Sequence, residues 1–229
     1  MTNNPIFCAI DTNDIKQALS LIEKIKESIG GIKLGLEFYT HCGIEGINKI
    51  QTLGLPIFID LKLFDIPNTA KSALQGILNL KPEFTTLHIL GGSKMIRECV
   101  NVKNSNQSQT NLIGVTVLTS FDEIRIKEVG IHNSIDDQVL ILAKLANENN
   151  LDGIVCSPQE IRRIKQETEN NLKLIVPGVR NIGDDTNDQK RTMNASEAIN
   201  AGADILVIGR PITMANDPAE AAYKIFKSL

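Results

Sequence analysis

The sequence predicts a single (β/α)8 barrel that takes up the whole chain, residues 1–229, and three observations favour it. Eight short apolar runs recur along the chain, as expected for strands buried on both faces. Amphipathic segments with helical spacing separate these runs, and the length suits one α/β barrel. The alternative fold is an open doubly wound sheet. Against it, no G-x-G-x-x-G motif follows the first run, and no G-x-x-x-x-G-K-[ST] motif is present.

The eight predicted strands are Ile6–Ile10, Ile32–Leu36, Ile57–Ile59, Thr85–Ile89, Leu112–Leu118, Gly153–Cys156, Leu172–Val176 and Ile205–Ile208. Two segments between them, Ile15–Ile29 and Asp136–Asn149, place apolar residues at helical spacing and predict helices. The pairs Ser157-Pro158 and Asp217-Pro218 each join a capping residue to a proline suited to a first helical turn. We therefore expect a helix to begin at each pair, with Glu160 as the capping acid of the first.

Two segments predict loops. Asn101–Asn111 is rich in Ser, Gln and Asn, which indicates a surface excursion before the fifth strand. Gly178–Thr192 is the longest break, between the seventh strand and the next helix. Long loops at the C-terminal end of a barrel are usually functional, so we expect this loop to serve the site.

Composition and charge narrow the function classes. The net charge is −3 and the pI about 5.7, so no bulk basic field would attract nucleic acid. Trp is absent and aromatics are 4%, which argues against stacking platforms for single strands. The four cysteines form no CxxC pair, which argues against a zinc site and predicts reduced thiols in a cytoplasmic protein. Residues Met1–Pro5 resemble neither a signal peptide nor a membrane span, so no membrane partner is expected.

Residues 57–69 carry the sharpest functional signal. An apolar run leads into Asp60, Lys62 and Asp65, and period-2 geometry puts Asp60 and Lys62 on one side of an extended segment. Pro67 suits the first turn of a following helix. The charges therefore stand where a strand ends and a helix begins, which is where α/β proteins bind ligands. The plainer alternative is a solvated ion pair worth under about 1 kcal/mol.

Polar residues at the other strand ends would converge on the same barrel mouth. They are Asp11, Lys33, His88, Thr119, Ser120, Pro177, Arg180, Gly209 and Arg210. The loops after strands seven and eight form the usual phosphate site of such barrels, and there Arg180, Gln189 and Gly209-Arg210 offer suitable donors. Alternatively, Gly209-Arg210 is a turn with a surface arginine. We expect His88 to pack or hydrogen-bond at the mouth rather than to catalyse.

The charged residues predicted at the ends of the second and third strands alternate in sign, in the order Lys33, Asp60, Lys62 and Asp65. Ionised groups held out of water are stable only when they pair with one another. A lysine in such a network can deliver a proton to carbon as a general acid. With a phosphate anchor opposite, the pattern indicates formation and protonation of a carbanion on a phosphorylated substrate. The sequence has no evident metal-ligand cluster, so lysine would supply the positive charge.

The segment Asp60-Leu-Lys62-Leu-Phe-Asp65-Ile-Pro67-Asn-Thr69 resembles the signature of the orotidine 5′-monophosphate decarboxylase family. The resemblance is to the bacterial form and covers essentially the whole chain. The other matching segments are 115–120, 155–157, 176–180, 188–191 and 207–212. Two departures are Phe64, where many bacterial members have His, and Ile89-Leu90, which replace smaller residues.

The resemblance implies a homodimer that converts orotidine 5′-monophosphate to uridine 5′-monophosphate and CO2 in de novo pyrimidine synthesis, without cofactor or metal. It implies that Lys62 protonates C6 of the substrate after CO2 leaves. Asp60 would lie beside the departing carboxylate, and Lys33 would hold the network and touch the ribose. The resemblance also implies that Asp11 binds the ribose hydroxyls, that Thr119 and Ser120 lie near the pyrimidine, and that Pro177 lies elsewhere in the substrate site. The implied phosphate contacts are Arg180, Gln189, Gly209 and Arg210. Asp65 and Thr69 would reach into the neighbouring subunit's site.

Two alternatives stay open. One is a magnesium-dependent sugar-phosphate decarboxylase of the keto-gulonate 6-phosphate type, which shares D-x-K-x-x-D on the same barrel. Such enzymes place an acidic metal ligand at the second strand, where this chain has Lys33. The other is a catalytically silent nucleotide-binding barrel, which would have no need of the network around Asp60 and Lys62.

Overall fold

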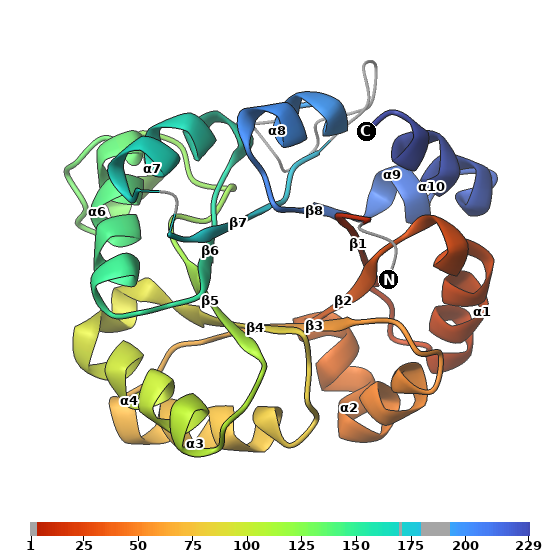
Figure 1. Ribbon diagram of the computed structural model, residues 1–229, viewed down its shortest axis with the longest axis horizontal. Coiled ribbons are helices and arrows are strands. Elements are labelled where there is room, and N and C mark those ends of the chain that lie inside the picture. Colours follow the sequence, from red (N-terminus) through yellow and green to blue (C-terminus); the bar gives the residue numbers. More distant parts are fainter. Residues whose placement is uncertain (1–3, 170, 180–192) are drawn as a thin grey trace.

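The computed structural model describes residues 4–169, 171–179 and 193–229, and its strands form a closed parallel barrel in the order β1 to β8 (Figure 1). The strands are β1 (Ile6–Ala9), β2 (Gly31–Gly35), β3 (Ile57–Leu63), β4 (Phe84–His88), β5 (Asn111–Val115), β6 (Gly153–Val155), β7 (Lys173–Val176) and β8 (Ile205–Ile208). Each predicted apolar run overlaps one strand, and the predicted (β/α)8 architecture is confirmed.

Helices surround the barrel and follow the strands (Figure 1). They are α1 (Ile15–Ile25), α2 (Leu36–Gln51), α3 (Pro67–Leu78), α4 (Gly92–Ser105), α5 (Arg125–Glu128), α6 (Ile135–Glu148), α7 (Ile161–Glu167), α8 (Ala195–Ala201), α9 (Arg210–Thr213) and α10 (Pro218–Lys227), with short 3₁₀ turns η1 (Lys26–Ser28), η2 (Ile89–Gly91) and η3 (Pro158–Glu160). Asp217 caps α10 by accepting from two backbone N–H groups, and the Ser157 N–H donates to Glu160 Oε2 at 2.7 Å. Both predicted helix starts are confirmed, although the first opens with the 3₁₀ turn η3.

Some predicted boundaries are wrong, and the site explains two of them. Strand β3 runs to Leu63 rather than ending at Ile59, because Asp60 and Lys62 bond to β4 through a side chain of that strand. Strand β5 ends before the predicted Leu118, and that residue lines the cavity described below. The predicted helix Ile15–Ile29 is α1 followed by η1.

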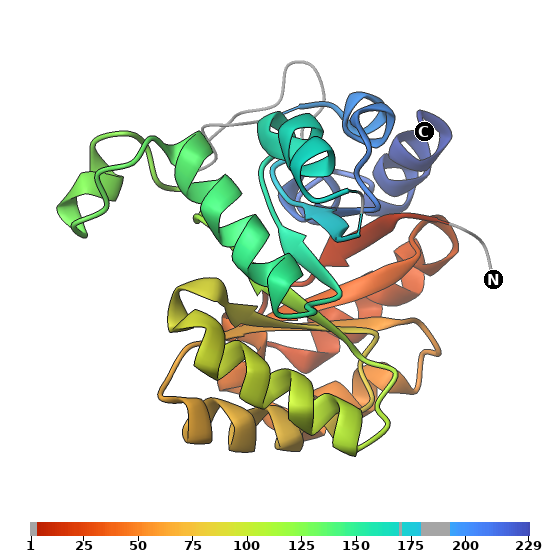
Figure 2. The same ribbon diagram turned by 60° about the vertical axis from the view of Figure 1, so that its left-hand side comes forward.

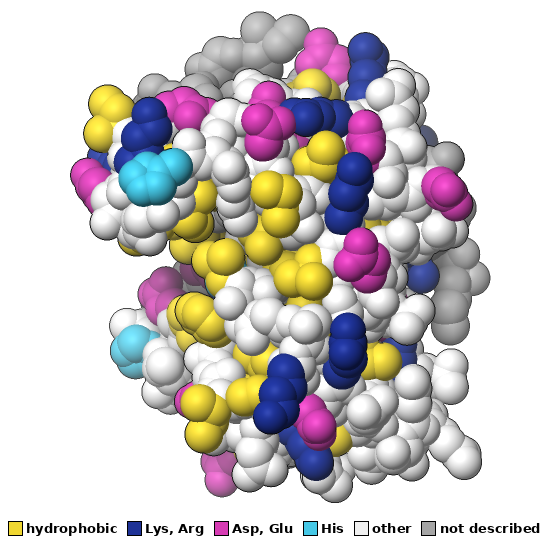
Figure 3. Space-filling model, turned by 90° about the vertical axis from the view of Figure 1, so that its left-hand side faces the viewer, with side chains coloured by type: hydrophobic (Ala, Val, Ile, Leu, Met, Phe, Trp, Pro, Cys, Tyr) yellow, Lys and Arg dark blue, Asp and Glu magenta, His cyan; other side chains and the backbone are white. Residues whose placement is uncertain are grey.

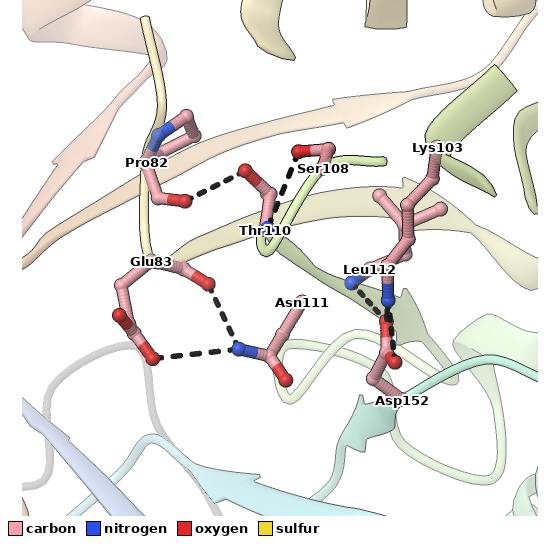
Figure 4. A network of polar contacts seen from close by, with 8 residues as sticks. All are labelled: Pro82, Glu83, Lys103, Ser108, Thr110, Asn111, Leu112 and Asp152. Atoms are coloured by element: carbon pink, nitrogen blue, oxygen red, sulfur yellow. Dashed lines mark hydrogen bonds and ion pairs between the residues drawn. The ribbon is translucent and has the colours of Figure 1, made fainter. Parts of the chain in front are cut away.

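The polar segment Asn101–Asn111, predicted as a surface excursion, is helical up to the end of α4. The polar composition of this segment could not distinguish a loop from the last turn of a helix, because the exposed face of such a turn is also polar. Residues of the last turn of α4 and of the stretch after it tie the segment to the N-terminal end of the barrel (Figure 4). The Thr110 hydroxyl donates to the Pro82 carbonyl at 2.8 Å, and Lys103 Nζ donates to Asp152 Oδ1 at 2.6 Å. Polar contacts therefore fix the chain between α4 and β5 to this end of the barrel.

Apolar side chains pack in two layers. The larger cluster lies between strands and helices, and a smaller one fills the barrel itself. In the smaller cluster the ring of Phe84 meets Phe7 and Phe58 edge to face, with centroids 5.3 and 5.8 Å apart. A Cβ added at Gly31 would lie 2.3 Å from the Phe7 ring, so the close approach of this ring requires glycine. These rings lie near the N-terminal ends of their strands and leave the other end of the barrel open to polar groups.

The chain between β5 and α6, which carries α5, projects beyond the barrel on the side toward which β1 points (Figure 2). This is the side of the strands' C-terminal ends, where barrels of this kind bind ligands. In the described parts of the chain, none of the helices has the length and apolar character needed to cross a membrane.

Candidate active site

A cavity of about 490 Å³ opens at the C-terminal mouth of the barrel. Its floor is apolar, and four of its residues belong to the cluster that fills the barrel, namely Ala9, Phe58, Ile175 and Val207. Its wall holds eight residues singled out in the sequence, namely Asp11, Lys33, Asp60, Lys62, Thr119, Pro177, Gly209 and Arg210. An apolar floor with a few convergent polar groups is typical of a small-molecule site.

Three of these side chains form a partly buried charge network. Lys62 Nζ lies 2.8 Å and Lys33 Nζ 3.5 Å from the same atom, Asp60 Oδ2. Asp11 adds a longer contact, 3.7 Å from its Oδ1 to Lys33 Nζ. The side chains of Lys33 and Asp60 are only 12% and 11% exposed, so each ion depends on its partners for stabilisation. The predicted alternation of charge at the mouth is present for these residues.

The Asp60 carboxyl is held ionised. Burial by itself raises its pKa, but the ammonium groups of Lys33 and Lys62 lower it, and hydrogen bonds from Lys62 and Thr86 add to that effect. The net pKa lies below its ordinary value of 3.8. A full negative charge therefore faces the cavity at neutral pH, balanced by two cations.

Lys62 reaches this network from an irregular stretch of strand. Its φ is +52°, in the left-handed region that side chains rarely adopt. The β3–β4 pairing is regular at Ile59↔Thr85 and resumes at Leu63↔Leu87, with a shift between them. Asp60 and Lys62 do share a side, as predicted, but a bulge rather than a flat strand brings them together.

Gly35, the last residue of β2, keeps space for the same network. A Cβ added there would lie 3.0 Å from Lys33 Nζ and 3.5 Å from Asp11 Oδ1. The first of these distances is tighter than ordinary van der Waals contact, so a side chain at Gly35 would force the Lys33 ammonium to shift by a few tenths of an ångström.

The predicted phosphate end is only partly described. Gly209 and Arg210 follow β8 and line the cavity, Gly209 as the residue before α9. Pro177 follows β7 and lines the cavity as well. Arg180 and Gln189 lie outside the described residues, as does most of the predicted functional loop.

Three predicted site residues do not line the cavity of their own chain. Asp65 and Thr69 are exposed, and the Asp65 carboxylate accepts from the Ile66 N–H at 2.7 Å. Ser120 is also exposed, on the segment that leads into α5, while its neighbour Thr119 lines the cavity. The structure therefore brings the β1, β2 and β3 charges together but leaves Asp65 and Thr69 facing outward.

His88 packs and hydrogen-bonds at the mouth, as predicted. Its Nδ1 accepts from the Leu90 N–H at 3.4 Å, and its ring lies 5.4 Å from that of Phe64, centroid to centroid. Burial, followed by the nearby charge of Lys62, lowers the pKa of His88 below its usual 6.5. The ring is therefore neutral at pH 7 and contributes packing and one acceptor.

Sequence reasoning missed Thr86, Thr213 and Met214. Thr213 and Met214 line the cavity just after the Gly-Arg pair. Thr86 lies beneath the network, where its hydroxyl donates to Asp60 Oδ1 at 2.9 Å. The sequence did hold a signal for Thr86. Side chains alternate along a strand, and Phe84 points into the barrel, so Thr86 and His88 point to the same side as Phe84.

Within residues 4–169, 171–179 and 193–229, no group of three or more His, Cys, Asp or Glu side chains gathers in a way that could hold a metal ion. Among the described residues that line the cavity, the cationic side chains are those of Lys33, Lys62 and Arg210.

Known proteins resemble this chain over its length. Residues 4–225 match the family model described as Orotidine 5′-phosphate decarboxylase / HUMPS family. Orotidine 5′-phosphate decarboxylase of Wolbachia sp. subsp. Brugia malayi is 46% identical over 226 residues, covering 99% of each chain. The enzyme of that name from Paramagnetospirillum magneticum is 44% identical over 227 residues, covering 97% of each. The crystal structure of orotidine 5′-phosphate decarboxylase from Lactobacillus acidophilus superposes with a TM-score of 0.86 at 32% identity, covering 98% of both chains.

Proposed function

The chain belongs to the orotidine 5′-phosphate decarboxylase / HUMPS family, and on this premise we propose that it decarboxylates orotidine 5′-monophosphate to uridine 5′-monophosphate in the cytoplasm. The observation that carries the proposal is the pair of ammonium groups, those of Lys33 and Lys62, that contact the buried Asp60 carboxylate at the edge of the cavity. Relatives that bear this enzyme's name at 42–46% identity support the choice of reaction within the family.

The substrate lies across the cavity with its phosphate toward Gly209 and Arg210 and its base over the apolar floor. A guanidinium matches the geometry of phosphate oxygens, and a glycine lets the backbone approach them closely. Asp11 and Lys33 face the ribose. Binding energy from the remote phosphate then helps to hold the reacting end against the charge network.

The chemical step is loss of CO2 from C6. The bond between C6 and the carboxylate carbon breaks, its electron pair stays on C6, and the Lys62 ammonium delivers a proton to that carbon. The ammonium is held 2.8 Å from Asp60 before the substrate binds, so its charge is already oriented toward the developing carbanion. The ionised Asp60 opposes the substrate's carboxylate and raises the energy of the bound ground state.

Two experiments separate this reaction from its rivals. Loss of substrate absorbance is followed with orotidine 5′-monophosphate in the presence of a chelator, and full activity is expected. Activity that needs added magnesium would favour the sugar-phosphate decarboxylase. Tight binding with no absorbance change in a single turnover would favour the silent nucleotide-binding barrel.

The proposed active unit is a homodimer in which Asp65 and Thr69 complete the partner's site. Both residues are exposed, and so are large apolar side chains just after β2, β3 and β4: Leu36 is 56% exposed, Phe64 60%, Ile66 68% and Leu90 45%. The face that α4 and α6 present also gathers hydrophobic side chains in its middle and toward its hollowed edge (Figure 3). Exposed apolar rims of this kind mark protein–protein contacts.

Subunit mixing tests the shared site. Lys62→Ala and Asp65→Ala are each expected to be nearly inactive alone. After unfolding and refolding together in equal amounts, half of the dimers are mixed and half of their sites keep both groups, so about a quarter of the wild-type activity is expected.

The matched control mixes Lys62→Ala with Asp60→Asn. Both groups belong to one subunit's site, so every site of the mixed dimer lacks one of them and activity stays low. The shared role of Asp65 would be refuted if mixing Lys62→Ala with Asp65→Ala gave no more decarboxylase activity than this control.

A further inference from the structure

A single β4 residue faces the whole irregular stretch of β3. Pairing is regular at Ile59↔Thr85 and again at Leu63↔Leu87, so four steps along β3 correspond to two along β4. Residues 60–62 therefore stand opposite Thr86 alone. The two charged residues of the proposed chemistry, Asp60 and Lys62, are both in this stretch.

The Thr86 hydroxyl contacts both of them. It donates to Asp60 Oδ1 at 2.9 Å and accepts from the Lys62 backbone N–H at 2.8 Å. A hydroxyl has one proton to donate, and here that proton is directed to the carboxylate. Thr86 is 1% exposed and is not among the residues that line the cavity, so it acts from beneath the site.

These two bonds fix different things. The two ammonium groups hold Asp60 Oδ2, so the bond from Thr86 to Oδ1 sets the rotation of the carboxylate about its axis. The bond to the Lys62 N–H replaces a ladder bond that the bulge has broken. It supports the backbone at the residue whose φ is +52°.

We propose that Thr86 is a positioning residue of this site, whose hydroxyl sets the orientation of Asp60 and the backbone from which Lys62 reaches C6. The inference rests on the proposed function, because it assigns Thr86 to the alignment of that reaction's two charged groups. Thr86 does not contact the substrate and acts only through these two residues.

The test replaces the hydroxyl with a methyl group. Thr86→Val keeps the side chain's size and leaves Asp60 Oδ1 and the Lys62 N–H without this partner. A hydrogen bond to a charged group of this kind corresponds to about a 10- to 100-fold effect, so kcat is expected to fall by that factor. KM is expected to change less than threefold, because the phosphate contacts lie across the cavity. Thr86→Ser restores the hydroxyl and is expected to recover most of kcat.

Thr85 supplies a matched control on the same strand. It is also 1% exposed, but its hydroxyl has no hydrogen-bond partner among the described residues. Period 2 turns it away from the barrel interior that Phe84 and Thr86 face. Thr85→Val is therefore expected to leave kcat unchanged and to keep or raise the stability of the fold.

A readout without substrate separates this inference from the proposed function. The Asp60 carboxyl is titrated by ¹³C NMR in the free protein, where the described charged or titratable neighbours at that part of the mouth include Lys33, Lys62, Asp11 and His88. Thr86→Val is expected to raise the Asp60 pKa, whereas Thr85→Val leaves it in place.

If the wild type does not decarboxylate the substrate but Thr86→Val still shifts the titration, the proposed function fails and the positioning of Asp60 stands. If the wild type is active and Thr86→Val matches Thr85→Val in both kcat and titration, the inference is overturned. Loss of kcat in Thr86→Val that Thr86→Ser does not recover would also overturn it, since the hydroxyl would not be responsible.

Discussion

Replacing Lys33 with Met removes one of the two ammonium groups on Asp60 while keeping the length of the side chain. At 3.5 Å and an effective dielectric constant near 20, the lost attraction is about 5 kcal/mol. Several terms offset it: the lysine no longer has to be desolvated, its repulsion with Lys62 disappears, and Asp60 keeps Lys62 and Thr86 as partners. We therefore expect a net loss of about 2 kcal/mol, below the 3–5 kcal/mol typical of a buried charge left unpaired.

Lys165→Met is the matched control for this change. Lys165 Nζ lies 3.6 Å from Asp204 Oδ2, nearly the same separation, but the two side chains are 27% and 42% exposed. Water screens this pair, so its loss is expected to cost less than about 1 kcal/mol. Urea unfolding at one protein concentration measures both variants, since the stability of a dimer depends on concentration.

The pH dependence sharpens the test. Because the folded-state pKa of Asp60 is lowered, its stabilising contribution is complete above the ordinary value of 3.8 and is lost as the pH falls through the lower folded value. Without Lys33 that folded pKa rises, so the variant loses less stability on acidification. The difference in the free energy of unfolding between the wild type and Lys33→Met should therefore become smaller as the pH falls from 5 toward 3. The reasoning would be refuted if Lys33→Met and Lys165→Met lost the same free energy of unfolding. It would also be refuted if the difference between the wild type and Lys33→Met stayed constant with pH.

Three further outcomes are expected. Asp60→Asn lowers kcat more than about 100-fold while substrate binding, measured by calorimetry, does not weaken; weaker binding would count against repulsion in the ground state. Gly35→Ala displaces the Lys33 ammonium and lowers kcat/KM about tenfold at unchanged stability, and an unchanged kcat/KM would show that the contact is not tight. Phe64→Ser weakens the proposed dimer at least about tenfold in analytical ultracentrifugation, whereas Tyr223→Ser on α10 does not; equal effects would remove Phe64 from the interface.

The barrel could be predicted because its signal is repeated and local. Each strand is a short apolar run, and the order of runs and amphipathic segments fixes the topology. The convergence of Asp11, Lys33, Asp60 and Lys62 followed from that topology alone, since the C-terminal ends of barrel strands meet at one mouth.

The details that failed depend on contacts distant in sequence. The extension of β3 to Leu63 depends on Thr86, which is 24 positions away from Lys62 in the sequence. The apolar run Ile57–Ile59 carries no signal that the strand continues. Thr86 itself reads as an ordinary β-former within an apolar strand. For Asp65, the family resemblance and not the pattern of strands predicted a place outside its own chain's cavity; the structure leaves Asp65 exposed, and its role in a second subunit stays a prediction.

The left-handed backbone of Lys62 has a consequence for the stability of this strand. A side chain at φ +52° costs about 1–2 kcal/mol relative to glycine in the same conformation. Lys62→Gly should therefore be more stable than Lys62→Ala, although both lack the proposed proton donor. Glycine would relieve this strain but would also remove the ion pair between Lys62 and Asp60, so the strand bears a backbone cost at the residue on which the proposed chemistry depends.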